Sequence, residues 1–247
     1  MNRLSAVVVA LNEAENIERC VAAALTAADE VVVVDTGSTD ATASLARRAG
    51  ARVVELEWQG FARTKNAAHA HAQYDWILSL DADEVVTPEL ARSIRAFMQH
   101  PEGKTGKIGR LPFYCGREIR RSGWFPDKKV RIFDRNRARW VGEYVHETLE
   151  SRDEAVELPG LLWHFTVTSV AGHVQTLNRY SDLQAEEYLK RGKKITWFHL
   201  FVKPVYVFFN ILLFRRGWMD GKAGWMIATL SAFSYFLKYA KTWMRQP

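Results

Sequence analysis

The sequence predicts an α/β fold for its first 100 residues, with a mainly parallel sheet covered by helices on both faces. Two observations lead to this prediction. Short, continuous apolar runs such as 4–10 (LSAVVVA) and 76–80 (WILSL) have the length and composition of buried strands. Stretches of helical periodicity alternate with these runs, which is the pattern of a doubly wound sheet.

The expected elements alternate between strand and helix along this half of the chain. They are strands at 4–10, 30–34, 52–56 and 76–80 and helices at 13–24, 40–49 and 61–72. Residues 105–165 change to short strands and loops rich in Gly, Arg and aromatic residues. Helical spacing returns at Val170 and is expected to continue to Lys190.

Length and charge limit the classes of function. A chain of 247 residues can bury a core without disulfides or a structural metal. The net charge of +6 favours anionic partners, and the basic residues concentrate at 117–139 and after Lys190. They form no recognised nucleic-acid-binding element, so we expect no nucleic acid partner. The first apolar run is too short for a signal peptide, which predicts a cytosolic protein unless its C-terminal end binds a membrane.

Polar and acidic residues follow three of the predicted strands, at the edge where ligands bind in parallel sheets. We expect these groups to converge on one rim: Leu11 to Glu13, Asp35 to Ser38, and Asp81 to Glu84. Asp81 and Asp83 in an Asp-x-Asp turn can bind Mg²⁺ or Mn²⁺, with water and diphosphate oxygens completing the shell. The alternative is a solvated acidic turn that caps the next helix.

Asp35 ends a buried strand and can accept hydrogen bonds from a base or a ribose hydroxyl. The alternative is an ordinary strand-turn-helix connection, with Ser38, Thr39 and Asp40 as capping residues.

Three ordered stretches resemble family 2 glycosyltransferases, which have the GT-A fold: VVVALNEAENIERCV, VVVVDTGSTDAT and RTKNAAHAHAQYDWILSLDADE. The resemblance implies that Asn12 and Glu13 border the nucleotide pocket and that Asp35 contacts the base or ribose. It places Lys65 near the donor, Asp81 facing the ribose or donor sugar, and Asp83 on the metal. Many members have a second Asp where this chain has Thr36, which weakens the inference about base contacts.

Residues 122–150 (SGWFPDKKVRIFDRNRARWVGEYVHETLE) resemble a narrower branch, the bacterial lipopolysaccharide core glycosyltransferases of the heptose-region glucosyltransferase type. Inverting transfer needs a base that takes the proton of the acceptor hydroxyl. Glu147, next to His146, is the first candidate and Asp127 the second. Trp124 either stacks on a sugar or packs internally.

A basic stretch precedes and overlaps the same region, and it suits a diphosphate or a phosphorylated acceptor. Its members are Arg117, Arg120, Arg121, Lys128, Lys129 and Arg131. Arg131 lies between apolar Val130 and Ile132, so its side chain can face the cleft while theirs pack. His164 either completes the metal shell or belongs to the core, and we favour the core.

The last fifty residues are apolar and aromatic, but His199, Lys203, Pro204 and Asn210 interrupt the run at 197–214. We expect amphipathic helices that lie in a membrane interface, in preference to helices packed on protein or a re-entrant hairpin. The expected organisation is a GT-A catalytic domain at 1–165, with a nucleotide-binding half at 1–100 and an acceptor-binding part at 101–165. A helical segment follows at 166–247.

The resulting expectation is a metal-dependent hexosyltransferase at the cytoplasmic face of the inner membrane. It would move a sugar, with UDP-glucose as the favoured donor, to a lipid-linked glycan such as the lipopolysaccharide inner core. A polyprenyl-phosphate glycosyltransferase and a non-catalytic glycan- or membrane-binding protein of the same fold remain alternatives. A nucleotidyltransferase is disfavoured because ALNEAEN is not a Gly-rich, basic loop.

Overall fold

A computed structural model describes residues 2–142 and 148–246 and divides the chain into two compact units. Unit 1 consists of Met1–Arg110 and Asp127–His164. Unit 2 consists of Leu111–Pro126 and Phe165–Pro247, so that a loop from the middle of the sequence belongs with the C-terminal helices.

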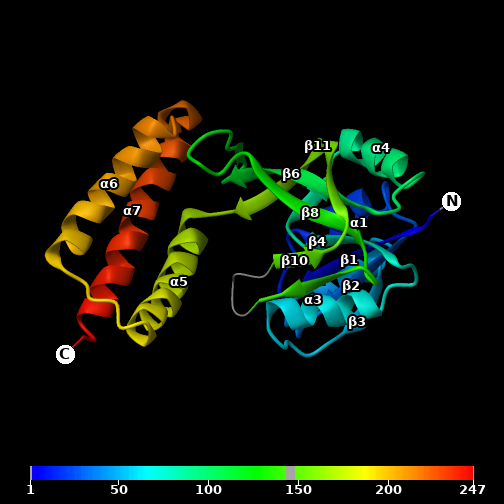
Figure 1. The fold of residues 1–247 in the computed structure, drawn as a ribbon, viewed down its shortest axis with the longest axis horizontal. Coiled ribbons are helices and arrows are strands. Elements are labelled where there is room, and N and C mark those ends of the chain that lie inside the picture. Colours follow the sequence, from blue (N-terminus) through cyan, green and yellow to red (C-terminus); the bar gives the residue numbers. More distant parts are fainter. Residues whose placement is uncertain (1, 143–147, 247) are drawn as a thin grey trace. The chain divides into compact units, whose positions relative to one another are not determined.

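The first half of unit 1 is the predicted parallel sheet (blue to cyan in Figure 1), with strand order β3-β2-β1-β4. Its strands are β1 (Leu4–Ala10), β2 (Glu30–Asp35), β3 (Arg52–Glu55) and β4 (Trp76–Asp81). The register pairs Ala10 with Asp35 and Val9 with Asp81. The carboxyl ends of β1, β2 and β4 therefore lie at one edge of the sheet, as the sequence predicts.

The second half of unit 1 continues the sheet with antiparallel strands, in the order β4-β8-β6-β11-β5. Their bounds are β5 (Glu84–Val86), β6 (Lys104–Tyr114), β8 (Asp127–Asp134) and β11 (Glu154–Val167), and β9 (Ala138–Val141) and β10 (Thr148–Ser151) form a separate ribbon. The last residues of β6 and β11 belong to unit 2, as does β7 (Arg117–Glu118), which pairs with the end of β6. The expectation of short strands is wrong for β6 and β11, which have 11 and 14 residues. Pro112 and Pro159 lie inside these strands and interrupt the sequence pattern that normally marks a strand.

Helices cover both faces of this sheet, as expected for the fold class. They are α1 (Ile17–Ala24), α2 (Thr42–Arg48), α3 (Phe61–Ala70) and α4 (Pro88–Phe97). One core joins α1, α2 and α4 to the sheet through residues such as Cys20, Leu78 and Leu90, and the other joins α3 through Ile77 and Phe133. Adjacent residues of β4 thus enter opposite cores, which is the alternation of a strand buried on both sides.

Unit 2 is helical, and the helix predicted from Val170 is observed as α5 (Val170–Lys190). The segment Phe198–Phe214 is α6 (Lys203–Phe209) between two π-helical turns, Phe198–Val202 and Asn210–Phe214. A 3₁₀ turn, Gly217–Asp220, then leads into α7 (Gly221–Trp243), which packs against both α5 and α6. Figure 1 shows these helices in yellow, orange and red.

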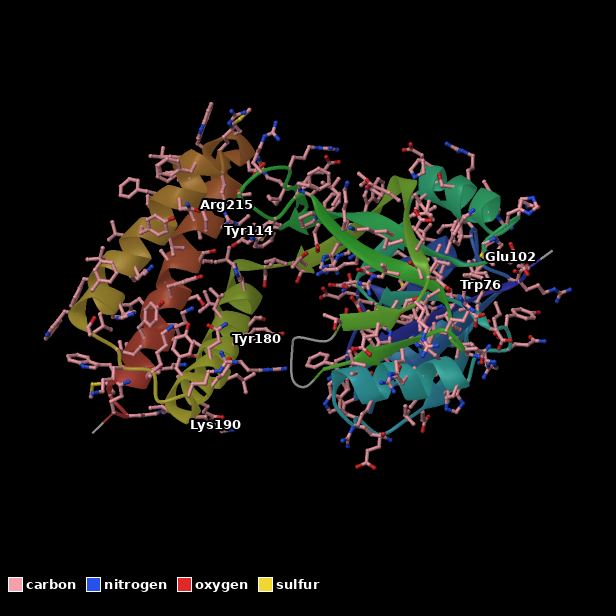
Figure 2. The ribbon with its side chains drawn as sticks, in the orientation of Figure 1. Trp76, Glu102, Tyr114, Tyr180, Lys190 and Arg215 are labelled. Atoms are coloured by element: carbon pink, nitrogen blue, oxygen red, sulfur yellow. The ribbon has the colours of Figure 1, made fainter. Side chains whose placement is uncertain are left out.

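The loop 111–126 is fastened to the helices of unit 2. The Asp220 carboxylate accepts hydrogen bonds from the backbone N–H groups of Arg120 and Arg121 and from the Ser122 hydroxyl. Tyr114 shares an apolar cluster with Ile211 and Ile227, and the Arg215 carbonyl accepts a bond from the Ser122 N–H. Tyr114 and Arg215 are labelled in Figure 2.

Candidate active site at the carboxyl ends of β1, β2 and β4

The loops after β1 and β2 bind one another directly. The Asn12 N–H donates to the Ser38 hydroxyl at 2.9 Å, and the Asn12 carboxamide oxygen accepts the Thr39 N–H at 2.8 Å. Asn12 has a φ of 54°, an unusual conformation for a residue other than glycine. The paired loops hold this conformation in place, so the predicted nucleotide-side residues form one preorganised rim.

Asp35 takes part in the turn that follows its own strand. Its Oδ1 accepts hydrogen bonds from the Gly37 and Ser38 N–H groups, and the residue is 4% exposed. Gly37 has a φ of 102°, which suits glycine at this tight turn. The carboxylate thus has a structural task, and contact with a base or ribose stays a prediction for its second oxygen.

Glu13 lies beside the acidic turn after β4. Burial raises the pKa of the Glu13 carboxyl, a hydrogen bond from Asn16 opposes this, and the negative charge of Asp83 raises it further. The influence of Asp83 on Glu13 shows that the loops after β1 and β4 share one electrostatic environment.

Asp81 is surrounded by cations. Arg131 Nη2 lies 2.7 Å from Asp81 Oδ2, Lys65 Nζ lies 3.3 Å from Oδ1, and Arg110 Nη1 lies 3.8 Å from Oδ2. Burial would raise the pKa of Asp81, but Arg131 and Lys65 outweigh it, and the pKa lies well below its usual value. Asp81 therefore stays ionised. Both of its oxygens already face cationic side chains, so they are less available to a metal than those of an unpaired carboxylate.

Glu84 anchors the same network from the interior. Its side chain is fully buried, and its carboxylate accepts the Asp81 N–H at 3.0 Å and pairs with both Arg131 and Arg110. Glu84 was expected only as a neighbour of the Asp-x-Asp turn, and no role was predicted for Arg110. Arg110 lies opposite Asp127 in the register of β6 with β8, and this pairing, which no local pattern specifies, brings it into the network.

Asp83 has a different partner. Its Oδ2 lies 3.2 Å from His164 Nε2, and β5 and β11 bring the two together by pairing Glu84 with His164. Burial alone would lower the pKa of His164, but the hydrogen bond and charge of Asp83 raise it. The imidazole is directed to the acidic turn, and its place in a metal shell or in the core stays a prediction.

Of the two candidate bases, the structure describes Asp127 and not Glu147. Asp127 begins β8 and pairs with Arg110, whose Nε lies 2.9 Å from Asp127 Oδ2. Arg110 thus links Asp127 to Glu84 and Asp81. Glu147, with its neighbour His146, lies outside the described residues, and the flanking Thr148 lines the pocket beside Asp81.

The predicted basic stretch is divided between the two units. Arg117, Arg120 and Arg121 belong to unit 2, whereas Lys128, Lys129 and Arg131 belong to unit 1. Trp124 also belongs to unit 2, where its ring packs 6.0 Å from that of Tyr114, so the packing interpretation holds. The carboxamide of Asn66, next to Lys65, donates a hydrogen bond to the Trp140 carbonyl and accepts one from the Trp140 N–H, which connects β9 to α3.

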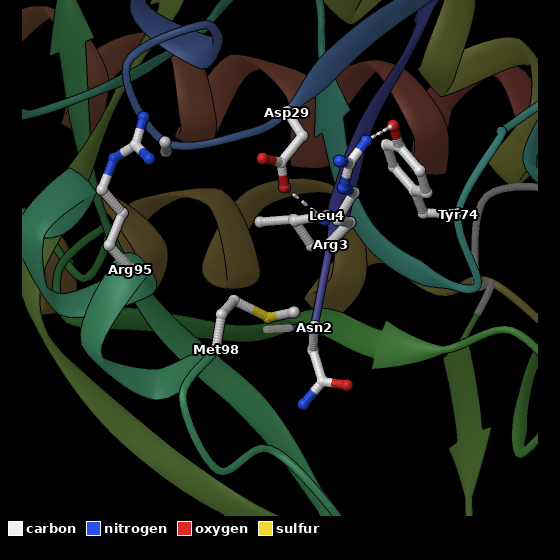
Figure 3. A pocket seen from close by; sticks show the side chains of 8 residues that line it. Asn2, Arg3, Leu4, Asp29, Tyr74, Arg95 and Met98 are labelled. Carbon is white, nitrogen blue, oxygen red and sulfur yellow. Dashed lines mark hydrogen bonds between the residues drawn. The ribbon is translucent and has the colours of Figure 1, made fainter.

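A second pocket of unit 1 lies at the opposite edge of the sheet. It has a volume of about 410 Å³ and is lined by Asn2, Arg3, Leu4, Ala27, Asp29, Tyr74, Arg95 and Met98 (Figure 3). Here Arg3 bonds the Tyr74 hydroxyl, and Asp29 accepts the Leu4 N–H. Because this pocket surrounds the amino end of β1, it is separate from the carboxyl-end rim where ligands bind in such sheets.

Comparison with known proteins decides the family. The sequence model of Glycosyl transferase family 2 matches residues 5–151, which include every element of the rim except His164. The chain belongs to this family. The site after β4 is therefore the acidic turn of a family 2 glycosyltransferase, and the mixed α/β sheet agrees with the expected GT-A fold.

Relatives of this family 2 glycosyltransferase extend over nearly its whole length. An uncharacterized glycosyltransferase of Rickettsia felis is 30% identical over 98% of this chain and 89% of its own. The lipopolysaccharide core biosynthesis glycosyltransferase LpsC of Rhizobium meliloti is 29% identical over 98% of this chain and 92% of its own. Glucosyl-3-phosphoglycerate synthase of Mycobacterium tuberculosis, solved with Mn²⁺, UDP-glucose and phosphoglyceric acid, is 26% identical over 50% of this chain and 45% of its own, with a TM-score of 0.39.

Proposed function

We propose that this family 2 glycosyltransferase transfers a sugar from a nucleotide donor, with inversion, to a lipid-linked glycan, and that UDP-glucose and the lipopolysaccharide inner core are the favoured pair. The observation that carries the proposal is the Asp83–His164 pair beside the Asp81–Arg131–Glu84 network, at the carboxyl end of β4. The relative LpsC supports the choice of acceptor.

The donor atoms at Asp83 and His164 fit a divalent cation. A carboxylate oxygen and an imidazole nitrogen 3.2 Å apart can both reach one ion, and this mixed set suits Mn²⁺ better than Mg²⁺, which prefers oxygen ligands. The described residues contain no cluster of three or more His, Cys, Asp or Glu ligands, so most coordination positions would remain for water and diphosphate oxygens. A bound cation would stabilise the negative charge of the leaving diphosphate.

The remaining residues of the site have roles that follow from their contacts. The joined loops at Asn12 and Ser38 offer a rigid wall for the nucleotide. Arg131, Lys65 and Arg110 hold Asp81 in its ionised form, in reach of donor hydroxyl groups. Their positive charges also stabilise negative charge that develops at this site during transfer.

Deprotonation of the acceptor hydroxyl falls to Asp127 or Glu147. Asp127 is favoured by position, because its side chain is 32% exposed and Arg110 holds it beside the pocket that contains Asp81. Arg110 fixes the position of the Asp127 carboxylate next to a hydroxyl that approaches along this pocket.

The chemistry is tested by turnover of a nucleotide-sugar panel with purified protein, Mn²⁺ or Mg²⁺, and a lipopolysaccharide-core acceptor. D83N and H164A should each reduce turnover at least 100-fold and raise the metal concentration needed for half-maximal rate. D127N and E147Q separate the two bases, since only the true base should lower kcat about 100-fold or more while donor affinity is kept. E186Q, an exposed carboxylate of α5, is the matched control. Metal-independent turnover in the wild type would contradict the cation role.

The acceptor proposal includes attachment of the helices of unit 2 to an anionic membrane surface. The segment Phe198–Phe214 exposes a row of large apolar side chains at helical spacing, each at least 47% accessible: Phe198, Phe201, Val205, Phe209 and Leu213. Lys203, Arg215 and Arg216 border the row. Apolar side chains in the acyl boundary with cations at the headgroups are the arrangement of an interfacial helix.

Among the described residues, no single helix has the length and hydropathy needed to cross a bilayer; Phe198–Phe214 and Gly217–Trp243 meet those criteria only as a pair bent by 72°. The interfacial arrangement is tested by sedimentation with vesicles of phosphatidylglycerol or of phosphatidylcholine. We expect binding to the anionic vesicles, weakened at least tenfold in F201S/F209S and unchanged in W58S, which removes an exposed aromatic residue of unit 1. Equal binding of both variants would contradict attachment through this face.

A further inference from the structure

The pocket beside Asp81 contains more positive charge than the network around Asp81 and Glu84 requires. It has a volume of about 380 Å³, and its lining includes six cationic side chains: Lys65, Lys107, Arg110, Lys128, Lys129 and Arg131. This size is at the lower end for small-molecule sites, about 300–1,000 Å³, so it can hold a sugar with a substituent.

Among residues 2–142 and 148–246, four carboxylates pair with these six cations. Asp81 pairs with Lys65 and Arg131, and Glu84 pairs with Arg131. Asp127 pairs with Arg110. Glu157 pairs with Lys128. Lys129 lies 3.7 Å from Asp127, which already pairs with Arg110, and Lys107 forms no ion pair within the described part of the chain. For the described residues, the surplus is therefore about two positive charges, located on β6 and β8.

Two buried donors in the lining are also unused. Arg131 Nε and Trp140 Nε1 have no hydrogen-bond partner within the described part of the chain, although the two residues are only 2% and 8% exposed. A buried N–H without an acceptor costs free energy, about 1–3 kcal/mol by typical values, so such groups are normally satisfied. Both belong to residues that line this pocket, which indicates that an acceptor atom of a ligand completes them.

We propose that the β6–β8 side of this pocket binds a phosphate group carried by the acceptor, with Lys107 and Lys129 as the main charges and Arg131 Nε and Trp140 Nε1 as donors. The inference rests on the proposed function for the identity of the acceptor. A phosphate monoester carries a charge of about −1.5 to −2 near neutral pH, which matches the surplus, whereas a carboxylate carries half as much. The donor diphosphate is assigned to the other side of Asp81, at Asp83 and His164.

The test is calorimetric titration of the full-length protein with inorganic phosphate, and with acetate, at constant ionic strength. Each titration is made with and without saturating UDP and Mg²⁺, which occupy the donor site. K107Q and K129Q remove one charge each at partly exposed positions. K104Q removes a lysine from the same strand that does not line the pocket, and it is the matched control.

Phosphate should bind in the presence of UDP, at least fivefold more tightly than acetate, and at least fivefold more weakly to K107Q and to K129Q than to the wild type or K104Q. Loss of phosphate binding when UDP is present would assign the pocket to the donor diphosphate and overturn the proposal. Binding unchanged in both lysine variants, or tighter binding of acetate, would also overturn it. Failure of UDP itself to bind would count against the proposed function, while the titration without UDP still tests the pocket.

Discussion

Replacing Arg131 with alanine tests whether the buried ion network stabilises the catalytic half of the sheet. Arg131 is 2% exposed and pairs with Asp81 at 2.7 Å and with the fully buried Glu84. Removing one partner of a buried ion pair costs about 3–5 kcal/mol, because the other charge stays behind without compensation. Arg110 Nη1 still lies 3.0 Å from Glu84, so we expect a loss of about 3 kcal/mol, at the lower end of that range.

The assay is hydrogen exchange of peptides from β4 and β8, which reports on this sheet and not on unit 2. A loss of about 3 kcal/mol corresponds to exchange more than 100-fold faster. The control R48A breaks a pair with Glu18 whose side chains are 68% and 48% exposed, and it should change exchange less than fivefold.

The double variant R131A/E84Q isolates the cause. If the penalty arises from the uncompensated carboxylate, neutralising Glu84 should recover at least about 1 kcal/mol of the loss. An R131A variant whose β4 and β8 peptides exchange within fivefold of the wild type would refute the reasoning, because Arg131 would then contribute no more than a surface pair.

Three further predictions concern stability. Burial lowers the pKa of His69 to about 3, and Lys65 and Arg135 add to this. His69 is therefore protonated below about pH 6.5 in the unfolded chain, but only below about pH 3 in the folded chain. Between these values the free energy of unfolding should fall by up to about 1.4 kcal/mol for each unit by which the pH is lowered. In urea titrations between pH 6.5 and 5, H69Q should lack this part of the pH dependence. G160A should lower the stability of unit 1 by about 2 kcal/mol or more, because Gly160 has a φ of 91° and its Cβ would lie 2.5 Å from the Leu90 nitrogen; a change in melting temperature below about 2 °C would contradict this. G224A places a Cβ 1.8 Å from the Gly217 carbonyl oxygen and should destabilise unit 2 by a similar amount, seen as faster exchange of α7 peptides with β4 unchanged.

Several features of this protein follow from local sequence alone. The β-branched runs at Leu4–Ala10 and Glu30–Asp35 are strands because continuous apolar stretches of that length can be buried only between two layers. The convergence of the loops after β1, β2 and β4 follows from the same pattern, because parallel strands end at one edge. The helix Val170–Lys190 was predictable from its apolar spacing.

Other features depend on contacts between residues distant in sequence. His164 meets Asp83 only because β11 pairs with β5, and no local pattern specifies that pairing. Arg110 enters the network through the register of β6 with β8. The strands containing Pro112 and Pro159 form because neighbouring strands and cores compensate for residues that locally disfavour a strand.

Local hydrophobic patterns and short motifs are sufficient to predict the family, the parallel half of the sheet and the acidic turn that carries Asp81 and Asp83. The pairing of Asp81 with cations, the contact of Asp83 with His164 and the division of the basic stretch between two units become visible only in the folded chain. Such assignments depend on strand order and register between residues 47 (Arg131 and Glu84) and 81 (His164 and Asp83) positions apart in the sequence, where burial and charge pairing, and not local propensity, select the partners.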